Sequence, residues 1–504
     1  MTIEEVVILG GGSAGLMAAV TLKRKMPELK VTVLRSQELG TIGVGEGTTP
    51  NFTEHVLGYL GVHPKMFYEV AQPTWKLGLR LEWGQRPHYD FSFALNLDAH
   101  WSDLPMSNGY YLDESFEAGN PAGAMMAAGK VFARRADGSP EVAPWHAFHV
   151  ENVKLIRLFE QLSRGLGVEL VEGRVAAVER GGEGVRALVT EDGRRFRADL
   201  FVDASGFRSE LLGTALEEPF VDFGKRHLFC DRAVVGGWER SGEPILPYTT
   251  AETMDSGWCW RIEHERWIHR GYVYGSGWIS DEEAEAEFVR KNPKAAGRTR
   301  VVKFRSGFHR RSWVGNVVAI GNSAGFVEPL EATALMLVSN ASRDLTNLLL
   351  KMGRRVSDSM RDLYNRRMEA SWTDIRDFLA IHYRFNDRLD TPFWRHCREE
   401  TDLSGVEELL RFYRENGPSG YARYALPNSL NDFGVEGYLV MLVGNRVPHA
   451  HPYRASDAER QRWNQHRAEL LDQARNGFDV AEALAWFRRH GWNHLVGVIG
   501  ASPS

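Results

Sequence analysis

A short apolar strand followed by a glycine-rich turn constrains the fold of this chain more than any other feature. Residues 6–9 (Val-Val-Ile-Leu) lead into Gly10-Gly11-Gly12-Ser13-Ala14-Gly15, and an apolar helical pattern follows. In a G-x-G-x-x-G turn, Gly10 permits the tight turn, Gly12 lets a pyrophosphate approach the backbone and Gly15 lets the helix pack on the strand. The next apolar strand, 31–34, completes a strand–helix–strand unit. The sequence therefore predicts an α/β fold with a Rossmann-like dinucleotide site.

Two later strand–turn segments favour a flavin over a nicotinamide. Segments 197–206 and 317–325 each carry an apolar strand that ends in small residues. They resemble the middle and last flavin motifs of FAD monooxygenase-type enzymes, although Asn322 stands where many of those carry Asp. Three motifs in the right order predict bound flavin adenine dinucleotide (FAD). The residues expected at the flavin from these two segments are Asp203, Gly321, Asn322 and Gly325.

Arg35, at the end of the second strand, departs from the usual dinucleotide pattern. About 20 residues after the glycine turn, an acidic residue normally holds the ribose hydroxyls. An arginine there is typical of a 2′-phosphate, which FAD lacks. Ser36 or Glu38 is the alternative ribose contact.

Two carboxylates follow the last flavin segment. Glu328 and Glu331 lie three residues apart around Pro329, and a helix predicted to start here places them on one face. An ordinary strand–turn–helix with acidic residues at the helix start is the alternative interpretation.

Composition fits a large enzyme. The 504 residues carry a formal net charge of −5, from 61 basic and 66 acidic residues, which gives no nucleic-acid or membrane-surface signal. The three cysteines show no metal-binding spacing, and no secretory signal or 18-residue apolar span is found, so we expect a cytoplasmic protein without a metal.

The chain's organisation is predicted to be interleaved. We expect an FAD-binding module over 1–345, with sheet segments facing the substrate at about 75–150 and 215–300. A mainly helical region, 346–504, is expected to cover the substrate site. Helical patterns occur over 354–379 and 455–487.

A tryptophan-rich segment resembles a family motif. Residues 258–262 (Trp-Cys-Trp-Arg-Ile) resemble the W-x-W-x-I-P motif of the flavin-dependent halogenases, the tryptophan halogenase family, but Glu263 replaces the Pro. The segments 271–274, 279–282 and 390–395 are also similar to that family. A further resemblance, over 42–50, is to its flavin strap. It implies flavin contacts from Gly43, Val44, Gly45 and Glu46.

The resemblance implies a reaction and its partners. In the family, FADH2 and O2 form a flavin hydroperoxide, halide (chloride or bromide) attacks it, and hypohalous acid passes to an essential lysine that chlorinates or brominates an aromatic ring. A separate NAD(P)H-dependent flavin reductase supplies the FADH2. A homodimer is compatible with this interpretation, and no nucleic acid or membrane partner is expected.

Lys76 and Glu331 match the family's two catalytic residues. Lys76 lies in an alternating segment, 75–83, and the alternative is a lysine on a solvated strand face. Glu331 would stabilise the cationic ring intermediate and take its proton, while Glu328 fits a structural role.

The remaining candidates surround the halide and the substrate. Thr333 and Ala334 match the family's halide-binding backbone, where an ordinary helix start is the alternative. Phe91 and Phe93 resemble its aromatic sandwich for the substrate, and Trp258 and Trp260 resemble the wall between substrate and flavin. Core packing is the alternative for all four aromatic residues.

The substrate is predicted to be indole or an indole derivative rather than free tryptophan. In tryptophan-specific relatives, a lid precedes a strand that resembles 438–444, and the lid grips the amino-acid end. Here the span 421–437 lacks the relatives' Phe-Trp pair, and burying a zwitterion without partners is unfavourable. A single-component FAD hydroxylase and a catalytically idle flavin-binding protein remain the alternative functions.

Overall fold

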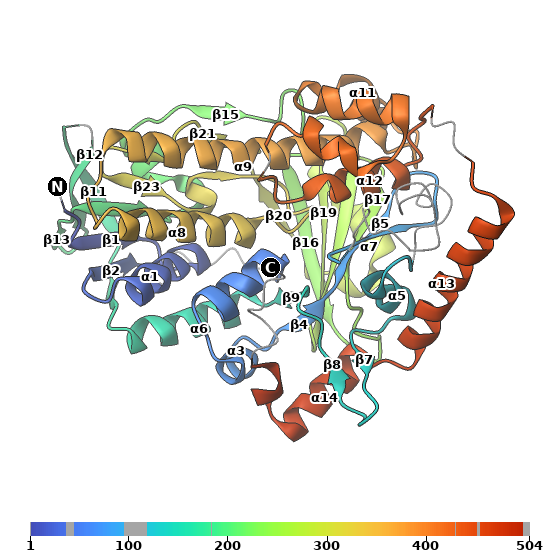
Figure 1. Ribbon diagram of the computed structural model, residues 1–504. Helices are drawn as coiled ribbons and strands as arrows, with labels where there is room; N and C mark the ends of the chain where they lie inside the picture. Colours follow the sequence, from blue (N-terminus) through green and yellow to red (C-terminus); the bar gives the residue numbers. More distant parts are fainter. Residues whose placement is uncertain are drawn as a thin grey trace. The chain divides into compact units, whose positions relative to one another are not determined.

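The computed structural model describes residues 2–36, 45–94, 118–182, 184–428, 430–450 and 454–496 (Figure 1). It divides into two compact units. Unit 1 comprises Met1–Gln72, Val150–Asp222 and Phe304–Trp372; unit 2 comprises Pro73–His149, Phe223–Lys303 and Thr373–Ser504. The sheet-forming segments between the flavin motifs thus group with the C-terminal residues.

Unit 1 is built on a six-stranded sheet in the order β10-β2-β1-β14-β23-β22. The first five strands are parallel and β22 is antiparallel. The sequences of β1, β14 and β23 are near-continuous apolar runs, as expected for strands buried on both faces. The bounds are β1 Glu5–Leu9, β2 Lys30–Arg35, β10 Glu169–Glu172, β14 Leu200–Asp203, β23 Val317–Ala319 and β22 Trp313–Val314.

Helices and two small sheets complete unit 1. Helix α1 (Ser13–Lys25) packs against α6 (Asn152–Gly165) and α8 (Ala334–Lys351). The small sheets are β11-β12-β13 (Val175–Gly181, Gly184–Thr190, Arg195–Phe196) and β15-β21-β24 (Phe220–Asp222, Gly307–His309, Gly325–Phe326). The order of β1, α1 and β2 confirms the predicted first unit of the α/β fold.

Unit 2 is built on a seven-stranded sheet in the order β20-β16-β19-β18-β17-β5-β6. All neighbours are antiparallel except β17 and β5. The bounds are β20 Arg300–Lys303, β16 Arg232–Glu239, β19 Trp267–Tyr274, β18 Gly257–Glu263, β17 Thr249–Met254, β5 Gly78–Glu82 and β6 Tyr89–Ser92.

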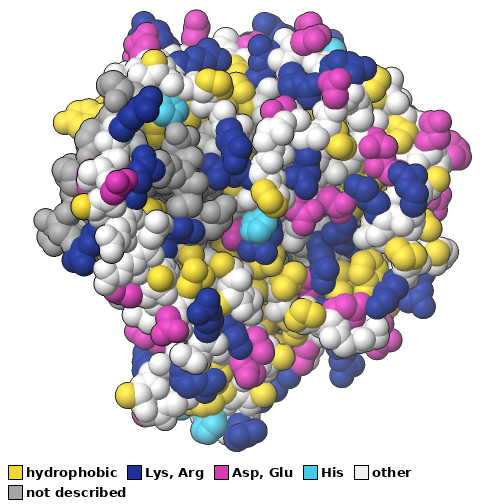
Figure 2. Space-filling model, turned by 90° about the vertical axis from the view of Figure 1, so that its right-hand side faces the viewer, with side chains coloured by type: hydrophobic (Ala, Val, Ile, Leu, Met, Phe, Trp, Pro, Cys, Tyr) yellow, Lys and Arg dark blue, Asp and Glu magenta, His cyan; other side chains and the backbone are white. Residues whose placement is uncertain are grey.

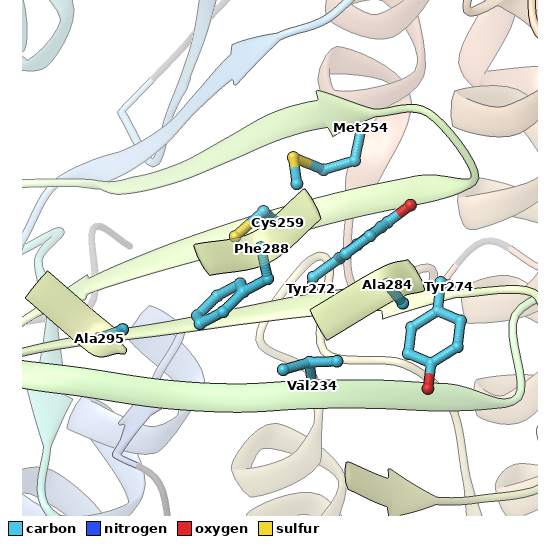
Figure 3. Packing of buried hydrophobic residues seen from close by; sticks show 8 residues of the cluster. All are labelled: Val234, Met254, Cys259, Tyr272, Tyr274, Ala284, Phe288 and Ala295. Atoms are coloured by element: carbon cyan, nitrogen blue, oxygen red, sulfur yellow. The ribbon is translucent and has the colours of Figure 1, made fainter. Parts of the chain in front are cut away.

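One face of this sheet packs against helix α7 (Asp281–Lys291). Cys259, Tyr272 and Phe288 are fully buried there, and Figure 3 shows Tyr272 and Phe288 lying among Val234, Met254 and Ala284. Because side chains alternate along β18, Trp258 and Trp260 must lie on the opposite face from Cys259. That opposite face carries the candidate substrate residues.

The C-terminal residues are mainly helical, as predicted. Helix α9 (Asp358–Phe385) begins in unit 1 and continues into unit 2, and five more α-helices follow among the described residues. These are α10 Pro392–Glu400, α11 Glu407–Asn416, α12 Gly434–Gly444, α13 Asp457–Arg475 and α14 Val480–His490.

One sequence prediction in this region was wrong. The run 438–444 is helical, within α12, because a short apolar run does not distinguish a strand from a buried helix. The helical pattern over 455–487 is confirmed; it forms two helices, because Asp479 caps a new helix through a capping box with Glu482.

In the described part of the chain, no helix is both long enough and apolar enough to cross a membrane. Figure 2 shows basic and acidic side chains interspersed over one face.

Candidate active site

The glycine loop of unit 1 has the geometry that a pyrophosphate requires. Gly10 has φ 121°, and a Cβ on it would lie 2.2 Å from the Ala204 carbonyl oxygen. A Cβ on Gly15 would lie 2.0 Å from the Gly10 carbonyl oxygen, whereas one on Gly12 would meet nothing within 4 Å. Gly10 and Gly15 are thus required because other backbone atoms lie too close for a side chain. Gly12 leaves room for a ligand to approach the loop.

The first turn of α1 is suited to bind phosphate. The helix starts at Ser13 and Ala14, and its N-cap residue, Gly12, makes no side-chain capping hydrogen bond. The leading N–H groups of such a helix are available to an anion. The loop therefore fits the pyrophosphate of FAD.

Arg35 is paired within the protein. Its guanidinium binds Glu160 and also Glu172, with an Nε–Oε1 distance of 2.6 Å to the latter. Its side chain lies over Gly11, since a Cβ there would be 2.7 Å from Arg35 Cβ. Of the alternative ribose contacts, Ser36 directly follows β2 and Glu38 lies outside the described residues.

The second flavin segment is fixed by Asp203. This buried carboxylate accepts hydrogen bonds from the N–H groups of Leu211 (2.8 Å) and Leu212 (2.9 Å) and from Ser205 Oγ (2.6 Å). Both of its oxygens therefore hold the turn after β14.

The third flavin segment closes against the first. Gly321 has φ 76°, and a Cβ on it would lie 2.7 Å from Ala14 Cβ. Asn322 follows in a short 3-10 turn and is partly exposed. Gly325 packs on β21, because its Cβ would lie 2.6 Å from the Gly307 carbonyl oxygen. Only small residues fit where these loops approach.

The strap residues are described only in part. Gly43 and Val44 lie outside the described residues. Gly45 adopts φ 60°, and Glu46 begins the two-residue strand β3 (Glu46–Gly47). Burial raises the pKa of Glu46 to about 7.

Glu328 and Glu331 do not share a helix, so that prediction was wrong. Helix α8 begins only at Ala334, and both carboxylates lie in the preceding turn. The reason is local: Ala332 adopts φ 56°, a left-handed conformation that interrupts helix and is strained in an alanine. Glu331 is 2% exposed.

Thr333 and Ala334 lie at the N-terminus of α8. Thr333 is the N-cap and makes no side-chain capping bond, and Ala334 is the first helical residue. An 18-residue helix presents its first N–H groups and its positive dipole end at this point. Such a terminus suits a halide ion.

Lys76 is buried in unit 2. It ends strand β4 (Thr74–Lys76), which pairs antiparallel with β9 (Ala147–Val150). Its exposed fraction is 0%, and its Nζ lies 5.2 Å from the centre of the Phe93 ring. The solvated alternative is wrong because Leu77 interrupts the alternation: β5 starts only at Gly78, and Leu77 N–H donates to the Pro247 carbonyl.

His149 was missed by the sequence analysis. It is the direct cross-strand partner of Thr74, two residues from Lys76, and its Nε2 lies 2.8 Å from Thr249 Oγ1. Burial, reinforced by the positive charges of Lys76 and Arg240, holds the pKa of His149 well below its usual value. Lys76 thus has a neutral imidazole in its surroundings.

Phe91 belongs to an aromatic stack. In β6 it lies 6.1 Å, centre to centre, from Phe378 of α9, and Phe378 stacks on Phe433 at 3.9 Å. A Cβ on Gly437 would lie 3.2 Å from the Phe91, Phe378 and Phe433 side chains. Phe378 and Phe433 could not be recognised from sequence, since nothing in their local pattern marks them.

Trp258 and Trp260 share a face of the sheet with Phe91. The register pairs Trp260 with Ala251, Ala251 with Leu81 and Leu79 with Phe91, and paired residues share a face. The two indole rings lie 6.0 Å apart. Among the described residues, neither buried indole N–H has a hydrogen-bond partner. The two tryptophans thus form an aromatic wall with two available donors.

The glycine-loop geometry and the parallel sheet are those of a dinucleotide-binding α/β protein. Residues 5–460 match the tryptophan halogenase family, and the chain belongs to it. It is 33% identical over 443 residues to tryptophan 7-halogenase RebH of Lentzea aerocolonigenes, with 82% of each chain covered.

Solved structures agree. MibH, a lanthipeptide tryptophan 5-halogenase, is 38% identical with a TM-score of 0.87, covering 97% of this chain and 94% of its own. BrvH, a flavin-dependent halogenase from Brevundimonas sp. BAL3, is 28% identical with a TM-score of 0.84, covering 96% and 99%. The chain is thus a flavin-dependent halogenase.

Proposed function

We propose that this enzyme uses FADH2, O2 and chloride or bromide to halogenate an indole ring in a molecule other than free tryptophan. The observation that carries the substrate assignment is the lid, residues 421–437. Tyr421, Tyr424 and Leu430 are 75%, 80% and 68% exposed, so these three lid side chains are open to solvent, whereas Ala422 and Val435 are buried. Arg423, a lid residue that could pair with a carboxylate, donates through its Nε to the Gly420 carbonyl (2.9 Å).

A substrate site without partners for both charged groups disfavours a zwitterion. Free tryptophan would have to give up the hydration of two charges, whereas indole or an indole derivative loses much less. The likeness to MibH, whose name specifies a lanthipeptide tryptophan, supports a substrate larger than the free amino acid.

The chain's own residues are assigned as follows. Bound FADH2 supplies, with O2, the oxidation that converts halide to hypohalous acid; the glycine loop, Asn322 and the strap would hold it. The first turn of α8, at Thr333 and Ala334, would hold the halide. Lys76 would present the halogen to the substrate, either as an ammonium bonded to hypohalous acid or as a haloamine.

The aromatic residues and Glu331 complete the assignment. Phe91 and Phe93 would contact the ring, and Trp258 and Trp260 would separate it from the flavin. When the ring carbon takes the halogen, the ring becomes cationic, and Glu331 would accept the proton that is lost. The hydroxyl group of hypohalous acid leaves with the ring proton as water, the second product of the reaction.

The test compares substrates. The enzyme is supplied with FAD, NADH, a flavin reductase and bromide, and kcat/KM is measured for indole, tryptophan and a tryptophan-containing peptide. A preference for indole or the peptide supports the proposal, and a clear preference for tryptophan contradicts it. Product mass also separates halogenation from hydroxylation.

The reductase is a separate protein in this proposal. The sequence has one dinucleotide fingerprint, at 10–15, which FAD itself would occupy. The purified chain with FAD and NADH alone should therefore oxidise NADH no faster than free flavin does. Rapid NADH consumption would show that the chain reduces its own flavin.

A further inference from the structure

Glu263 stands where the family motif has proline, and it is the centre of a buried ion cluster. Its exposed fraction is 0%, and its carboxylate binds Arg240 Nη2 and Arg261 Nε, the latter at 2.6 Å. We call Arg240, Glu263 and Arg261 the Glu263 cluster. A carboxylate held by two guanidiniums in a buried place fixes the end of β18 rigidly.

Arg240 is anchored by the backbone as well. Its Nη1 donates to the carbonyls of Glu243 (3.1 Å) and Pro244 (2.7 Å), and its Nη2 donates to that of His264 (2.9 Å). The cluster therefore ties β18 to the turn that follows β16, and Glu263 cannot move without breaking several charge-assisted bonds.

The backbone of Glu263 is hydrogen-bonded to strand β4, which carries Lys76. Its carbonyl oxygen accepts a hydrogen bond from Thr74 Oγ1, which is 1% exposed. Thr74 lies two residues before Lys76 on the same strand, so both side chains lie on the same face of β4. Strand β4 is three residues long and ends at Lys76, so this bond adds a side-chain contact to the ladder that β4 forms with β9.

His149 joins the same network. It faces Thr74 across the β4–β9 ladder, two residues from Lys76, and the positive charges of Lys76 and Arg240 add to burial in lowering its pKa. Its bond to Thr249 Oγ1 fixes the imidazole on the neighbouring sheet. Buried polar contacts of Glu263, Thr74 and His149 thus connect β18, which carries the two tryptophans, to β4, which carries Lys76.

We propose that Glu263 is a positioning residue for Lys76. Through Arg240 and Arg261 it fixes the peptide that binds Thr74, and so sets where the Lys76 ammonium meets the halogen donor. This inference rests on the proposed role of Lys76. Proline at 263 would leave the nearly buried Arg240 guanidinium and the partly exposed Arg261 guanidinium without their anion, which is unfavourable here.

The test measures coupling, defined as halogenated product per hypohalous acid made. Glu263→Gln keeps the side chain's shape and removes its charge. Hypobromous acid is trapped with a small halogen-accepting dye in the absence of substrate, and product is measured by mass spectrometry in its presence. We expect unchanged hypobromous acid and unchanged KM, with coupling lowered about 10- to 100-fold, the scale for a misplaced catalytic group.

A matched control is available in the same sheet. Glu252 of β17 binds Arg270 (2.6 Å) and Lys291 (2.9 Å), a cluster of the same kind that faces Cys259 in the register. Glu252→Gln should leave coupling unchanged. An equal loss in that variant, or normal coupling in Glu263→Gln, would overturn the proposal.

Thr74→Val provides a second test if Glu263→Gln does not fold. It removes the hydroxyl that binds Glu263 and should lower coupling in the same way; normal coupling would overturn the proposal. Lys76→Ala distinguishes this inference from the function itself. If that variant still halogenates, the role of Lys76 fails, whereas normal coupling in Glu263→Gln with an inactive Lys76→Ala rejects only the positioning role.

Discussion

At the scale of the residue, burial separates Lys76 from the other lysines. A lysine is rarely fully buried unless it is paired or functional, because its charge loses hydration. Here Lys76 is enclosed near Phe93 and a neutral His149. Such an environment strengthens a hydrogen bond to hypohalous acid, because little water competes for it.

Lys76→Ala should abolish halogenation and leave hypohalous acid formation intact, because halide oxidation and halogen delivery use different groups. The dye trap and product mass, measured at equal bound FAD, check this. Lys65→Ala, which changes an exposed lysine in α3 (Pro64–Val70), should behave as the wild type. Substantial product from Lys76→Ala would reject the mechanism.

Glu331→Gln should be slower than the wild type by about 10²-fold in kcat, the scale expected when a preorganised charge is removed. The amide keeps the shape but neither stabilises the cationic ring nor accepts its proton. Single-turnover product formation after a pulse of hypobromous acid production gives the rate. A loss of FAD binding in place of a slower transfer would assign Glu331 to the fold instead.

At the scale of the element, local patterns predicted what local interactions decide. The strand, glycine turn and helix over 5–25 form as expected, because the apolar runs and the close contact of Gly15 with Gly10 act within a few residues. The break at Leu77 and the helical state of 438–444 could not be predicted, because both depend on neighbours distant in sequence. The aromatic stack could not be predicted for the same reason. Phe378 and Phe433 are 55 residues apart in the sequence, and their rings come into contact only in the folded chain.

The start of α12 places Phe433 in that stack, so a prediction follows for the lid. Phe433→Ala should raise KM for indole about 10-fold with hypohalous acid formation unchanged, because an aromatic contact of 0.5–1.5 kcal/mol is lost. Substrate titrations at fixed FADH2 supply measure KM. The control is Tyr424→Ala, since that ring is 80% exposed and should not affect a small substrate. An unchanged KM in Phe433→Ala would show that the stack is only core packing.

At the scale of the whole molecule, the two units share one kind of acid sensitivity. Burial lowers the pKa of His55 in unit 1 to about 3 and that of His146 in unit 2 to about 4, from 6.5 in each case. In the folded protein both imidazoles therefore stay neutral at pH 5. In the unfolded chain both take up a proton below about 6.5.

This difference fixes the sign of the pH dependence. Below pH 6.5 the unfolded state binds more protons than the folded state, so the free energy of unfolding falls as pH falls, down to the folded pKa values. Each histidine contributes at most about 1.4 kcal/mol per pH unit in that window, and nothing above it.

His146→Gln should therefore make the free energy of unfolding fall less steeply between pH 6.5 and 4.5. At pH 8 the substitution can only lower that free energy, through lost packing and the lost bond between Nδ1 and the Ala143 carbonyl. Urea midpoints at pH 8, 6 and 5 measure the slope, with the exposed His490→Gln as the matched control. Parallel slopes for His146→Gln and the wild type would mean that this imidazole is not held neutral by the fold.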